Sequence, residues 1–540
     1  MNKRKVWFWI IGGFVLLIAG LFVGGLGLLG RLPWQGGNLY KDPQGRFTMQ
    51  VDPSWERVET DGPYTQFKVP DPPLNMYLLV LEAGTVDDAF SQALETVGFD
   101  PGLLGGDSVT TFGDWHAYQQ TDTAGLTYGL AGQIVGDKAY VMMIKTDKPG
   151  VSVENVAILR ALTSIKIAGK EEIAIESFSD VEALVRKEVD RLAGSSLSIA
   201  VVHQSEIVYT YAYGQANPAA GIPADTQTIY QYGSMTKVVT ASALMQLVEQ
   251  GKVDLDAWPG EYIPEFPKRW NVTVRQLLDH SACMPDNQRL TDGLIAYPGE
   301  SFAPLEEVFT TYVKDYPDLV CEPGKASAYS NPHFLALARI IEEVSGEPYD
   351  TYVVDHLLTP LAMESTRFQF VEADERYAKD QFPVAKVDNF IAELNDYRGP
   401  GQEKLVLQKG ESFATLNDYQ ILPPWGGLRG TPSDVTHFLQ MQLNGGRYGD
   451  IQILKPETVA AMQEMQSSTD GSSLGLGLSW WIGKDDFGDF YYHVGDGAGS
   501  EGTMRIYPDL GLGVVVMSNT TGYPRDRIVE GLVNAWKNEK

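Results

Sequence analysis

The alternation of apolar and polar residues divides the chain into three parts. Residues 6–30 form an unbroken run without a charged side chain, and a helix of that length, at about 1.5 Å per residue, is long enough to cross a hydrocarbon core of about 30 Å. Shorter periodic segments follow over 38–170, and longer ones over 171–540. We therefore predict a cytoplasmic stub, transmembrane anchor and linker over 1–37, and then two globular domains.

The first globular part, 38–170, has the periodicity of a small α+β domain. Three strands and one helix are predicted there, at 47–51, 76–80, 140–144 and 86–97. Its opening segment YKDPQGRFTMQVDPSW and its closing segment ALTSIKI faintly resemble the PsbP/Mog1-like fold. No polar residues in this part form a set that chemistry would require, so its role stays open.

The larger part, 171–540, begins and ends with strands. Each end contains a hairpin and a helix, predicted at 178–192, 197–203, 207–213, 502–507, 512–518 and 525–536. Helical periodicity dominates the residues between them. This order favours an α+β class in which one antiparallel sheet is built from both chain ends and flanked by helices.

The charge of the chain excludes one class of partner and predicts a topology. Lys and Arg number 42 against 70 Asp and Glu, and the net charge of −28 argues against nucleic-acid binding, which needs a basic face. Residues 1–40 hold four basic side chains and no acid, so −32 falls on the rest. Three of these cations precede the apolar run at residues 3–5, and only Arg31 follows it closely.

This charge bias predicts a single-pass cell-membrane protein with a cytoplasmic N-terminus and an extracytoplasmic remainder, held in the membrane by residues 6–30. A cleaved signal peptide is the alternative. The apolar run is longer than a usual signal-peptide core, and no A-x-A cleavage site follows it, which favours an uncleaved anchor.

Candidate chemistry begins at Gly-Ser-Met-Thr-Lys, residues 233–237, which opens the helical stretch 236–249. Ser234 is predicted at the helix N-terminus, with Lys237 one turn on and on the same face. A hydroxyl becomes a nucleophile when a neighbour takes its proton, and the ammonium and helix dipole favour negative charge on the serine oxygen. This S-x-x-K spacing therefore predicts a nucleophile with its proton acceptor.

Two further segments carry candidate site residues. Tyr329-Ser-Asn331 offers a tyrosine whose pKa nearby cations could lower enough for it to act as a base, and an amide that can orient a substrate or Lys237. A loop tyrosine capping the next helix is the alternative for this segment by itself. On the strand 491–495, alternation places His493 and Gly495 on one side, next to backbone that a substrate can approach closely.

In this order the three segments resemble the serine β-lactamase and penicillin-binding superfamily, in its class C-like branch with D,D-carboxypeptidases, D-aminopeptidases and esterases. The resemblance covers about 177–540 and includes the segments LLDHSACMP (277–285), WGGLRGTPSD (425–434) and NGG (444–446). It implies the β-lactamase/D,D-peptidase fold, with an all-helical region beside the sheet, and an acyl-enzyme. It also implies site residues: Ser234 as nucleophile, Lys237 and Tyr329 in proton transfer, Asn331, His493, Gly495 and Asp496 in substrate binding, and the backbone N–H groups of Ser234 and Asp496 as the oxyanion hole.

Departures from the family pattern bear on the substrate. His-Val-Gly stands where the family's β-lactamases carry Lys-Thr-Gly, and Asp496 follows it, which favours a peptidase or esterase over a true β-lactamase and disfavours anionic ligands. Arg429 is a candidate compensating cation, but a solvated loop arginine is the favoured interpretation. Cys283 and Cys321 lie in loops that border the active site in this fold, so the resemblance favours a disulfide between them.

The resulting hypothesis is a membrane-anchored extracytoplasmic serine hydrolase that acts through an acyl-enzyme on a small peptide, β-lactam or ester. We expect no cofactor and no metal, because the other histidines of 171–540 share no ligand spacing; they are His203, His280, His333, His356 and His437. The alternative is a non-catalytic or slow-turnover sensor that binds peptidoglycan-like or β-lactam ligands.

Overall fold

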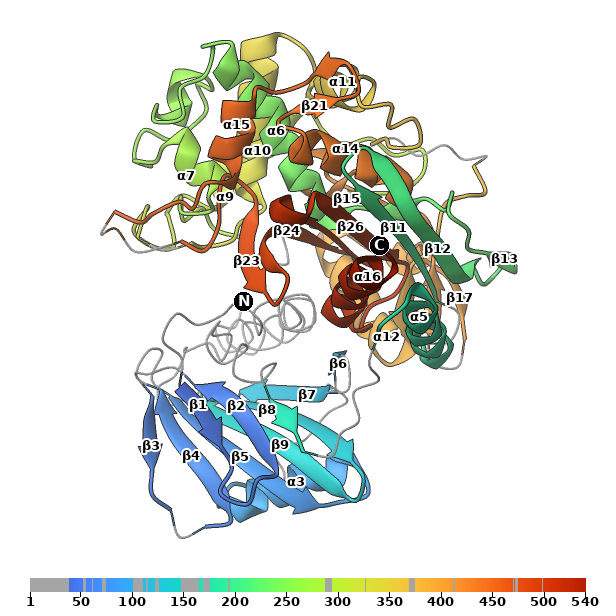
Figure 1. Ribbon diagram of the computed structural model, residues 1–540. Coiled ribbons are helices and arrows are strands. Elements are labelled where there is room, and N and C mark those ends of the chain that lie inside the picture. Colours follow the sequence, from blue (N-terminus) through green and yellow to red (C-terminus); the bar gives the residue numbers. More distant parts are fainter. Residues whose placement is uncertain are drawn as a thin grey trace. The chain divides into compact units, whose positions relative to one another are not determined.

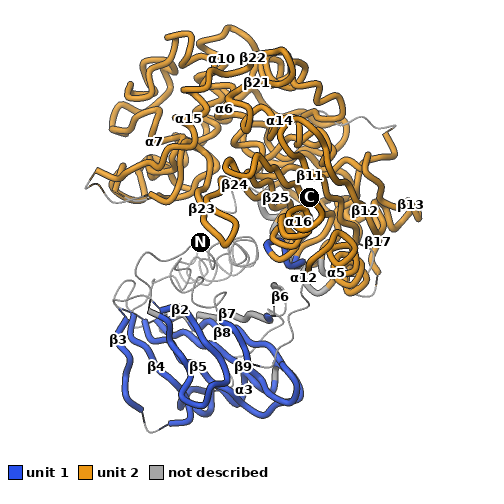
Figure 2. The backbone as a smooth tube through the Cα atoms, in the orientation of Figure 1, with its two compact units in different colours: residues 1–174, 522–526 blue, residues 175–521, 527–540 orange. Residues whose placement is uncertain are grey.

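The computed structural model describes residues 38–540 except for 52–54, 61, 70–73, 101–109, 113–114, 122–125, 147–164, 169–174, 193–194, 287–293, 326, 369–373, 411–412, 470, 472–473 and 498 (Figure 1). The predicted anchor at 6–30 lies outside these residues. Within the described part of the chain, no helix is both long enough and apolar enough to cross a membrane. The chain divides into two compact units, residues 1–174 with 522–526 and residues 175–521 with 527–540 (Figure 2).

Unit 1 is built on a seven-stranded antiparallel sheet in the order β3-β4-β5-β9-β8-β7-β6. These strands are β3 (Glu56–Val58), β4 (Tyr64–Val69), β5 (Leu74–Glu82), β6 (Thr110–Phe112), β7 (Trp115–Thr121), β8 (Thr127–Val135) and β9 (Lys138–Thr146). Helix α3 (Val86–Thr96) covers one face of the sheet. The other face is covered by a small sheet of β1 (Asn38–Lys41), β2 (Phe47–Val51) and β10 (Lys166–Ile167).

Strand β5 shows why unit 1 has three layers. Met76 and Leu78 pack against the small sheet, while Tyr77 and Leu79 pack against α3, because successive strand residues point to opposite faces. The strands and the helix predicted from periodicity at 47–51, 76–80, 140–144 and 86–97 all lie on observed elements. The resemblance to the PsbP/Mog1-like fold stays a prediction.

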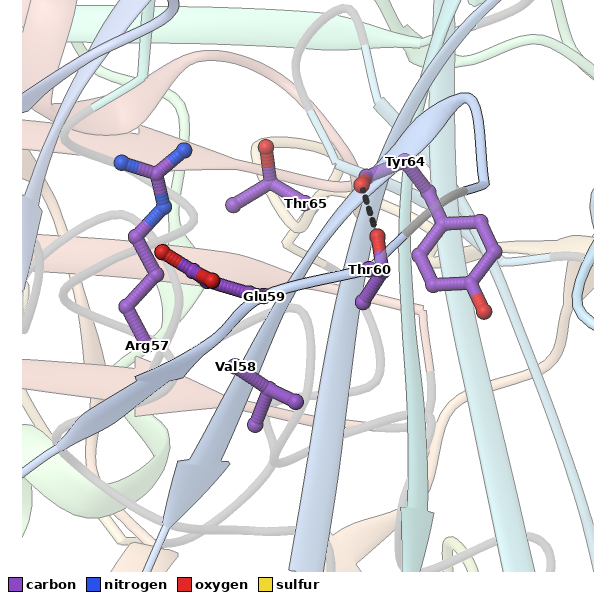
Figure 3. A pocket seen from close by; sticks show the side chains of 6 residues that line it. All are labelled: Arg57, Val58, Glu59, Thr60, Tyr64 and Thr65. Carbon is purple, nitrogen blue, oxygen red and sulfur yellow. Dashed lines mark hydrogen bonds between the residues drawn. The ribbon is translucent and has the colours of Figure 1, made fainter.

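A hollow of about 490 Å³ lies on the hairpin of β3 and β4, where Figure 3 shows its six lining residues: Arg57, Val58, Glu59, Thr60, Tyr64 and Thr65. The Thr60 hydroxyl donates to the Tyr64 carbonyl and so ties the two strands at the turn (Figure 3). The residues that line this hollow do not pair a nucleophile with a base, and the predicted catalytic residues belong to the other unit.

Unit 2 contains the predicted sheet, with seven antiparallel strands in the order β13-β12-β11-β26-β25-β24-β23. They are β11 (Ser196–His203), β12 (Glu206–Asn217), β13 (Ile222–Pro223), β23 (Trp481–Asp485), β24 (Gly488–Asp496), β25 (Glu501–Tyr507) and β26 (Leu512–Ser518). The pairing of β11 with β26, in which Leu197 faces Ser518, joins the two ends of the unit. Helix α5 (Phe178–Arg191) packs on β11 and β12, and α14 (Pro432–Leu443) packs on β11, β25 and β26 (Figure 1).

A helical region lies beside this sheet and shares its main apolar core. It contains α6 (Thr236–Glu249), α7 (Val274–Leu278), α9 (Leu305–Asp315), α10 (Pro332–Ser345), α11 (Tyr349–Val353), α13 (Pro423–Gly426) and α15 (Pro456–Gln463). Helix α6 is buried on nearly all sides, since α10, α11 and α13 pack against it. The prediction of an α+β fold with a sheet from both ends and a helical region is confirmed.

A third set of short elements carries its own apolar core in unit 2. These elements are β15 (Ile295–Ala296), β16 (Gln381–Pro383), α12 (Val384–Arg398), β17 (Val406–Lys409), β18 (Phe413–Leu416) and β19 (Gln420–Ile421). Next to them, β14 (Tyr230–Gln231) pairs with β20 (Arg429–Gly430). Strand β14 leads directly into the 3₁₀ turn η2 (Gly233–Met235) that opens α6.

Candidate active site

Two glycines bring Ser234 against the end of strand β24. Gly233 has φ +51°, and a Cβ placed there would lie 2.8 Å from the backbone nitrogen of Asp496. A Cβ on Gly495 would overlap the carbonyl oxygen of Tyr232. Only glycine permits both approaches, so the turn that carries the serine lies directly on the strand that carries His-Val-Gly.

The side chains predicted for proton transfer converge on the serine hydroxyl. Lys237 Nζ lies 3.0 Å from Ser234 Oγ, and the Tyr329 hydroxyl donates to the same oxygen across 2.7 Å. Lys237 Nζ also donates to Asn331 Oδ1 across 2.6 Å and to the carbonyl oxygen of Trp425 across 2.9 Å. Four elements thus contribute to one hydrogen-bonded cluster around the serine.

Burial changes the expected charge of Lys237. The side chain is fully buried, and this burial holds its pKa well below the usual value, although the nearby Asp286 carboxylate opposes the shift. A neutral amine has two hydrogens and one lone pair. It can donate to Asn331 and Trp425 while it turns its lone pair to the hydroxyl of Ser234, so the geometry fits a lysine that accepts the serine proton.

The prediction that nearby cations lower the pKa of Tyr329 is wrong. Burial raises the pKa of Tyr329, and the carboxylates of Asp286 and Asp496 raise it further. Burial also lowers the pKa of Lys237, which is the expected cation, and so weakens its positive charge beside Tyr329. Tyr329 therefore stays protonated, and it is a donor to Ser234 Oγ and not a base in the free enzyme.

Asp286 and the carbonyl of Trp425 belong to this cluster and were missed in the sequence. Asp286 Oδ2 accepts a hydrogen bond from the backbone N–H of Asn331 across 2.7 Å, and so fixes the amide that holds Lys237. The carboxylate lies in the loop after HSACMP, where no spacing rule relates it to the lysine. A backbone carbonyl leaves no signal in the sequence at all.

His493 lies behind the site and not on its surface. The ring is 1% exposed, Nδ1 donates to the carbonyl of Val494 across 2.7 Å, and Nε2 is buried with no partner among the described residues. Burial and the proximity of Lys237 lower the pKa of His493 to about 3, so the imidazole is neutral. The imidazole thus offers neither an exposed surface nor a positive charge to a substrate.

Arg429 is not the solvated loop residue that the sequence favoured. Its side chain is buried, it donates to the carbonyl of Tyr419, and its guanidinium lies over the rings of Tyr377 and Tyr419. The prediction failed because β20 pairs with β14 inside the unit, which draws this arginine away from solvent.

Two of the remaining histidines support the loop that precedes Asp286. His280 and His333 are fully buried, with their Nδ1 atoms 3.1 Å apart. The backbone N–H of Met284 donates to His333, and that of Ser330 donates to His280. No group of three His, Cys, Asp or Glu side chains among the described residues could hold a metal ion.

Cys283 and Cys321 form a disulfide in the structure, with their Cα atoms 5.3 Å apart. Cys283 has φ +60°, which is the backbone region that favours the glycine usual in the family. The backbone N–H of Ala328 donates to the carbonyl of His280 across 2.7 Å, so the two loops are joined by covalent and hydrogen bonds just before Tyr329.

Comparisons with known proteins show the family to which this chain is related. Residues 181–535 match the family model described as Beta-lactamase. A curated relative, the putative D-alanyl-D-alanine carboxypeptidase of Escherichia coli (strain K12), is 26% identical over 336 residues, which cover 56% of this chain and 72% of the relative.

Two solved structures share the fold. The octameric penicillin-binding protein homologue from Pyrococcus abyssi is 24% identical with a TM-score of 0.54, over 67% of this chain and 78% of the other. The D-amino acid amidase from Ochrobactrum anthropi SV3 is 20% identical with a TM-score of 0.53, over 66% and 97% of the two chains. Because the family model covers well over half of the sequence, this chain belongs to the Beta-lactamase family of serine hydrolases.

Proposed function

We propose that this chain hydrolyses amide or ester bonds through an acyl-enzyme on Ser234. The observation that supports this most directly is the convergence of Lys237 and Tyr329 on the serine oxygen, at 3.0 and 2.7 Å. A neutral lysine and a protonated tyrosine provide one proton acceptor and one proton donor at the same oxygen. Acylation needs a base that takes the serine proton and an acid that protonates the leaving group.

The first half-reaction follows from these contacts. Ser234 Oγ attacks the substrate carbonyl as Lys237 takes its proton, and the carbonyl electrons move to the oxygen, which the backbone N–H groups of Ser234 and Asp496 hold. The bond to the leaving nitrogen or oxygen then breaks. Tyr329 gives this atom a proton and regains one from Lys237. A water molecule then attacks the acyl group by the same steps and releases it from Ser234.

The electrostatics of the site favour a neutral or amine-bearing substrate over an anionic one. The charged groups that act on Tyr329 are the carboxylates Asp286 and Asp496, and His493 is neutral where the family's β-lactamases have a lysine. We therefore propose a peptidase, amidase or esterase and not a true β-lactamase. The names of the relatives add D-alanyl-D-alanine peptides and D-amino acid amides to the classes worth testing.

Ser234→Ala tests the nucleophile. The wild-type chain should label with a serine-directed fluorophosphonate, and the variant should not; undiminished labelling of the variant would place the nucleophile elsewhere. A p-nitrophenyl ester, a D-amino acid amide, a D-alanyl-D-alanine peptide and a chromogenic cephalosporin, tested in parallel, would rank the substrates. A burst without steady-state turnover on all four would favour the alternative of a slow-turnover sensor.

We also propose that residues 6–30 anchor the chain in the membrane with the hydrolase unit outside the cytoplasm. The proposal is supported by the unbroken apolar run and by the three cations that precede it. The full chain should resist extraction by alkaline carbonate, and Leu17→Arg with Ile18→Arg should release it. Protease added to intact cells should remove the hydrolase unit, and complete protection would contradict the orientation.

A further inference from the structure

A buried carboxylate outside the serine cluster joins two of the segments that form the site. Asp380 directly precedes β16 and is 4% exposed. Its Oδ2 atom accepts hydrogen bonds from Gln231 Nε2 and from the Tyr419 hydroxyl, each across 2.7 Å. Both donors are buried, so these bonds are shielded from water.

The two donors lie near the two segments that carry the N–H groups of the proposed oxyanion hole. Gln231 ends strand β14, three residues before Ser234. The Tyr419 hydroxyl lies 3.2 Å from the place where a Cβ on Gly497 would stand, and Gly497 directly follows Asp496. One carboxylate oxygen therefore binds a side chain from the segment before the nucleophile and a hydroxyl that lies beside the segment after β24.

Further backbone contacts tie Asp380 to the same loop. The N–H of its neighbour Gln381 donates to the carbonyl of Gly499 across 3.2 Å and to that of Asn519 across 2.7 Å. The segment after β24 is thus hydrogen-bonded to the residue that follows Asp380, and it lies beside the Tyr419 hydroxyl that Asp380 binds.

The negative charge of Asp380 is partly compensated by Arg429, which lies on β20, the strand paired with β14. Arg429 pairs with Gln231 between β14 and β20, and its positive charge acts on Asp380. Burial nevertheless raises the pKa of Asp380 to about 6, which leaves the carboxylate mostly ionised at neutral pH. A buried charge is a costly way to stabilise a fold, because apolar residues of similar volume are often as stabilising.

We propose that Asp380 is a positioning residue for acyl transfer, whose carboxylate holds the backbone N–H groups of Ser234 and Asp496 at the separation that an oxyanion needs. This inference rests on the proposed acyl-enzyme function. Donors aimed at a developing charge are effective only when their positions are fixed before the reaction. A displacement of about 1 Å can reduce the rate by about 100-fold.

The test is Asp380→Asn in the full chain, assayed on the best p-nitrophenyl ester. We expect kcat to fall between about 10-fold and 100-fold with KM changed less than about twofold. The reason is that the transition state loses more stabilisation from the oxyanion-hole donors than the bound substrate does. The inhibition constant of an aryl boronic acid, whose adduct places an oxygen in the oxyanion hole, should rise in step with the fall in kcat. Tyr419→Phe, which removes one bond and keeps the charge, should lower kcat by about fivefold.

Asp485→Asn is a matched control. Asp485 accepts a hydrogen bond from the Tyr507 hydroxyl across 2.7 Å and lies 3.6 Å from Arg505, so it is also a buried carboxylate with a tyrosine and an arginine. It pairs with Gly488 at the other end of β24, roughly 26 Å of strand from Asp496. This variant should lower the melting temperature without changing kcat or the boronate constant.

A reversed pair tests the contact itself. Asp380→Asn with Gln231→Glu returns one carboxylate and one amide to the same cavity, and it should recover most of the lost kcat. Unchanged kcat and boronate affinity in Asp380→Asn and Tyr419→Phe, with labelling still lost in Ser234→Ala, would overturn the role of Asp380 alone. Labelling retained in Ser234→Ala would instead overturn the proposed function, and this inference with it.

Discussion

The α-carbon of Gly495 lies directly against the carbonyl oxygen of Tyr232, so a methyl group there would overlap that oxygen. The overlap is with backbone, which cannot rotate away as a side chain would. Gly495→Ala must therefore push β24 away from the turn that carries Ser234. We expect at least a 100-fold loss of kcat/KM on an ester substrate, about the cost of losing one oxyanion donor.

Gly84→Ala is the control for this substitution, since no atom lies within 4 Å of a Cβ placed there and its φ is not positive. Its kcat/KM should equal that of the wild type. Wild-type activity in Gly495→Ala would show that the turn and strand can separate without harm to the reaction.

The acylation rate should depend on pH through Lys237. Its pKa is lowered by burial, so the neutral amine exists above that lowered value and the base is lost as pH falls through it. The rate constant for fluorophosphonate labelling should rise with pH and level off well below 10.5, the ordinary pKa of lysine. Lys237→Arg, which cannot lose its proton, should label about 100-fold to 10,000-fold more slowly at every pH. A profile that rises only near pH 10 would contradict this.

Loss of the Tyr329 hydroxyl should affect amides more than activated esters. The protonated tyrosine donates to Ser234 Oγ and is proposed to protonate the leaving group. Tyr329→Phe should lower kcat about 100-fold or more on a D-amino acid amide. The loss should be much smaller on a p-nitrophenyl ester, because nitrophenolate leaves without a proton.

Tyr349→Phe provides the comparison for Tyr329→Phe. Tyr349 is a buried tyrosine whose hydroxyl is hydrogen-bonded to Thr240 across 2.7 Å, so the same atom is removed from the same kind of surroundings. It should change the amide and the ester rates equally. An equal loss on both substrates in Tyr329→Phe would remove this tyrosine from leaving-group protonation.

The disulfide and the backbone of Cys283 make separable contributions to stability. The bond closes a loop of 38 residues, for which the chain-entropy estimate is about 4 kcal/mol. The double variant Cys283→Ser with Cys321→Ser should lose this contribution to the free energy of unfolding. It also keeps a residue other than glycine at φ +60°. Cys283→Gly with Cys321→Ser should be about 1 kcal/mol more stable than the double serine variant. Urea unfolding measures both differences, and equal midpoints would contradict the second.

Much of the fold could be predicted because its main elements are long and regular. The buried strands near both ends and the helix over 236–249 have clear periods, and the structure places them as expected. The elements around α12 could not be predicted in the same way. Strands such as β17 and β18 have four residues each, too few for a period to be distinguished from a loop.

The candidate site was predictable only where it is local. Ser234 and Lys237 are three residues apart where the turn η2 continues into α6, so their spacing alone predicts contact. Tyr329 lies 95 residues from Ser234, and although its segment was a candidate by itself, only the family resemblance related it to the serine. Burial has no signature in a short segment, which is why the direction of the Tyr329 pKa and the surroundings of Arg429 were wrong.

The pairing of β11 with β26 also sets the order in which the protein can fold. Val201 faces Val514, so the centre of the sheet needs two strands separated by more than 300 residues. Such distant contacts form slowly, because a long loop must close before they are made. During synthesis, β11 and β12 can form a hairpin early, but they expose an open edge until β26 emerges. A chain that stops before residue 512 therefore keeps the complete serine cluster in its sequence but lacks the central strand of its sheet, and it should be cleared as a misfolded protein and not survive as a weak enzyme.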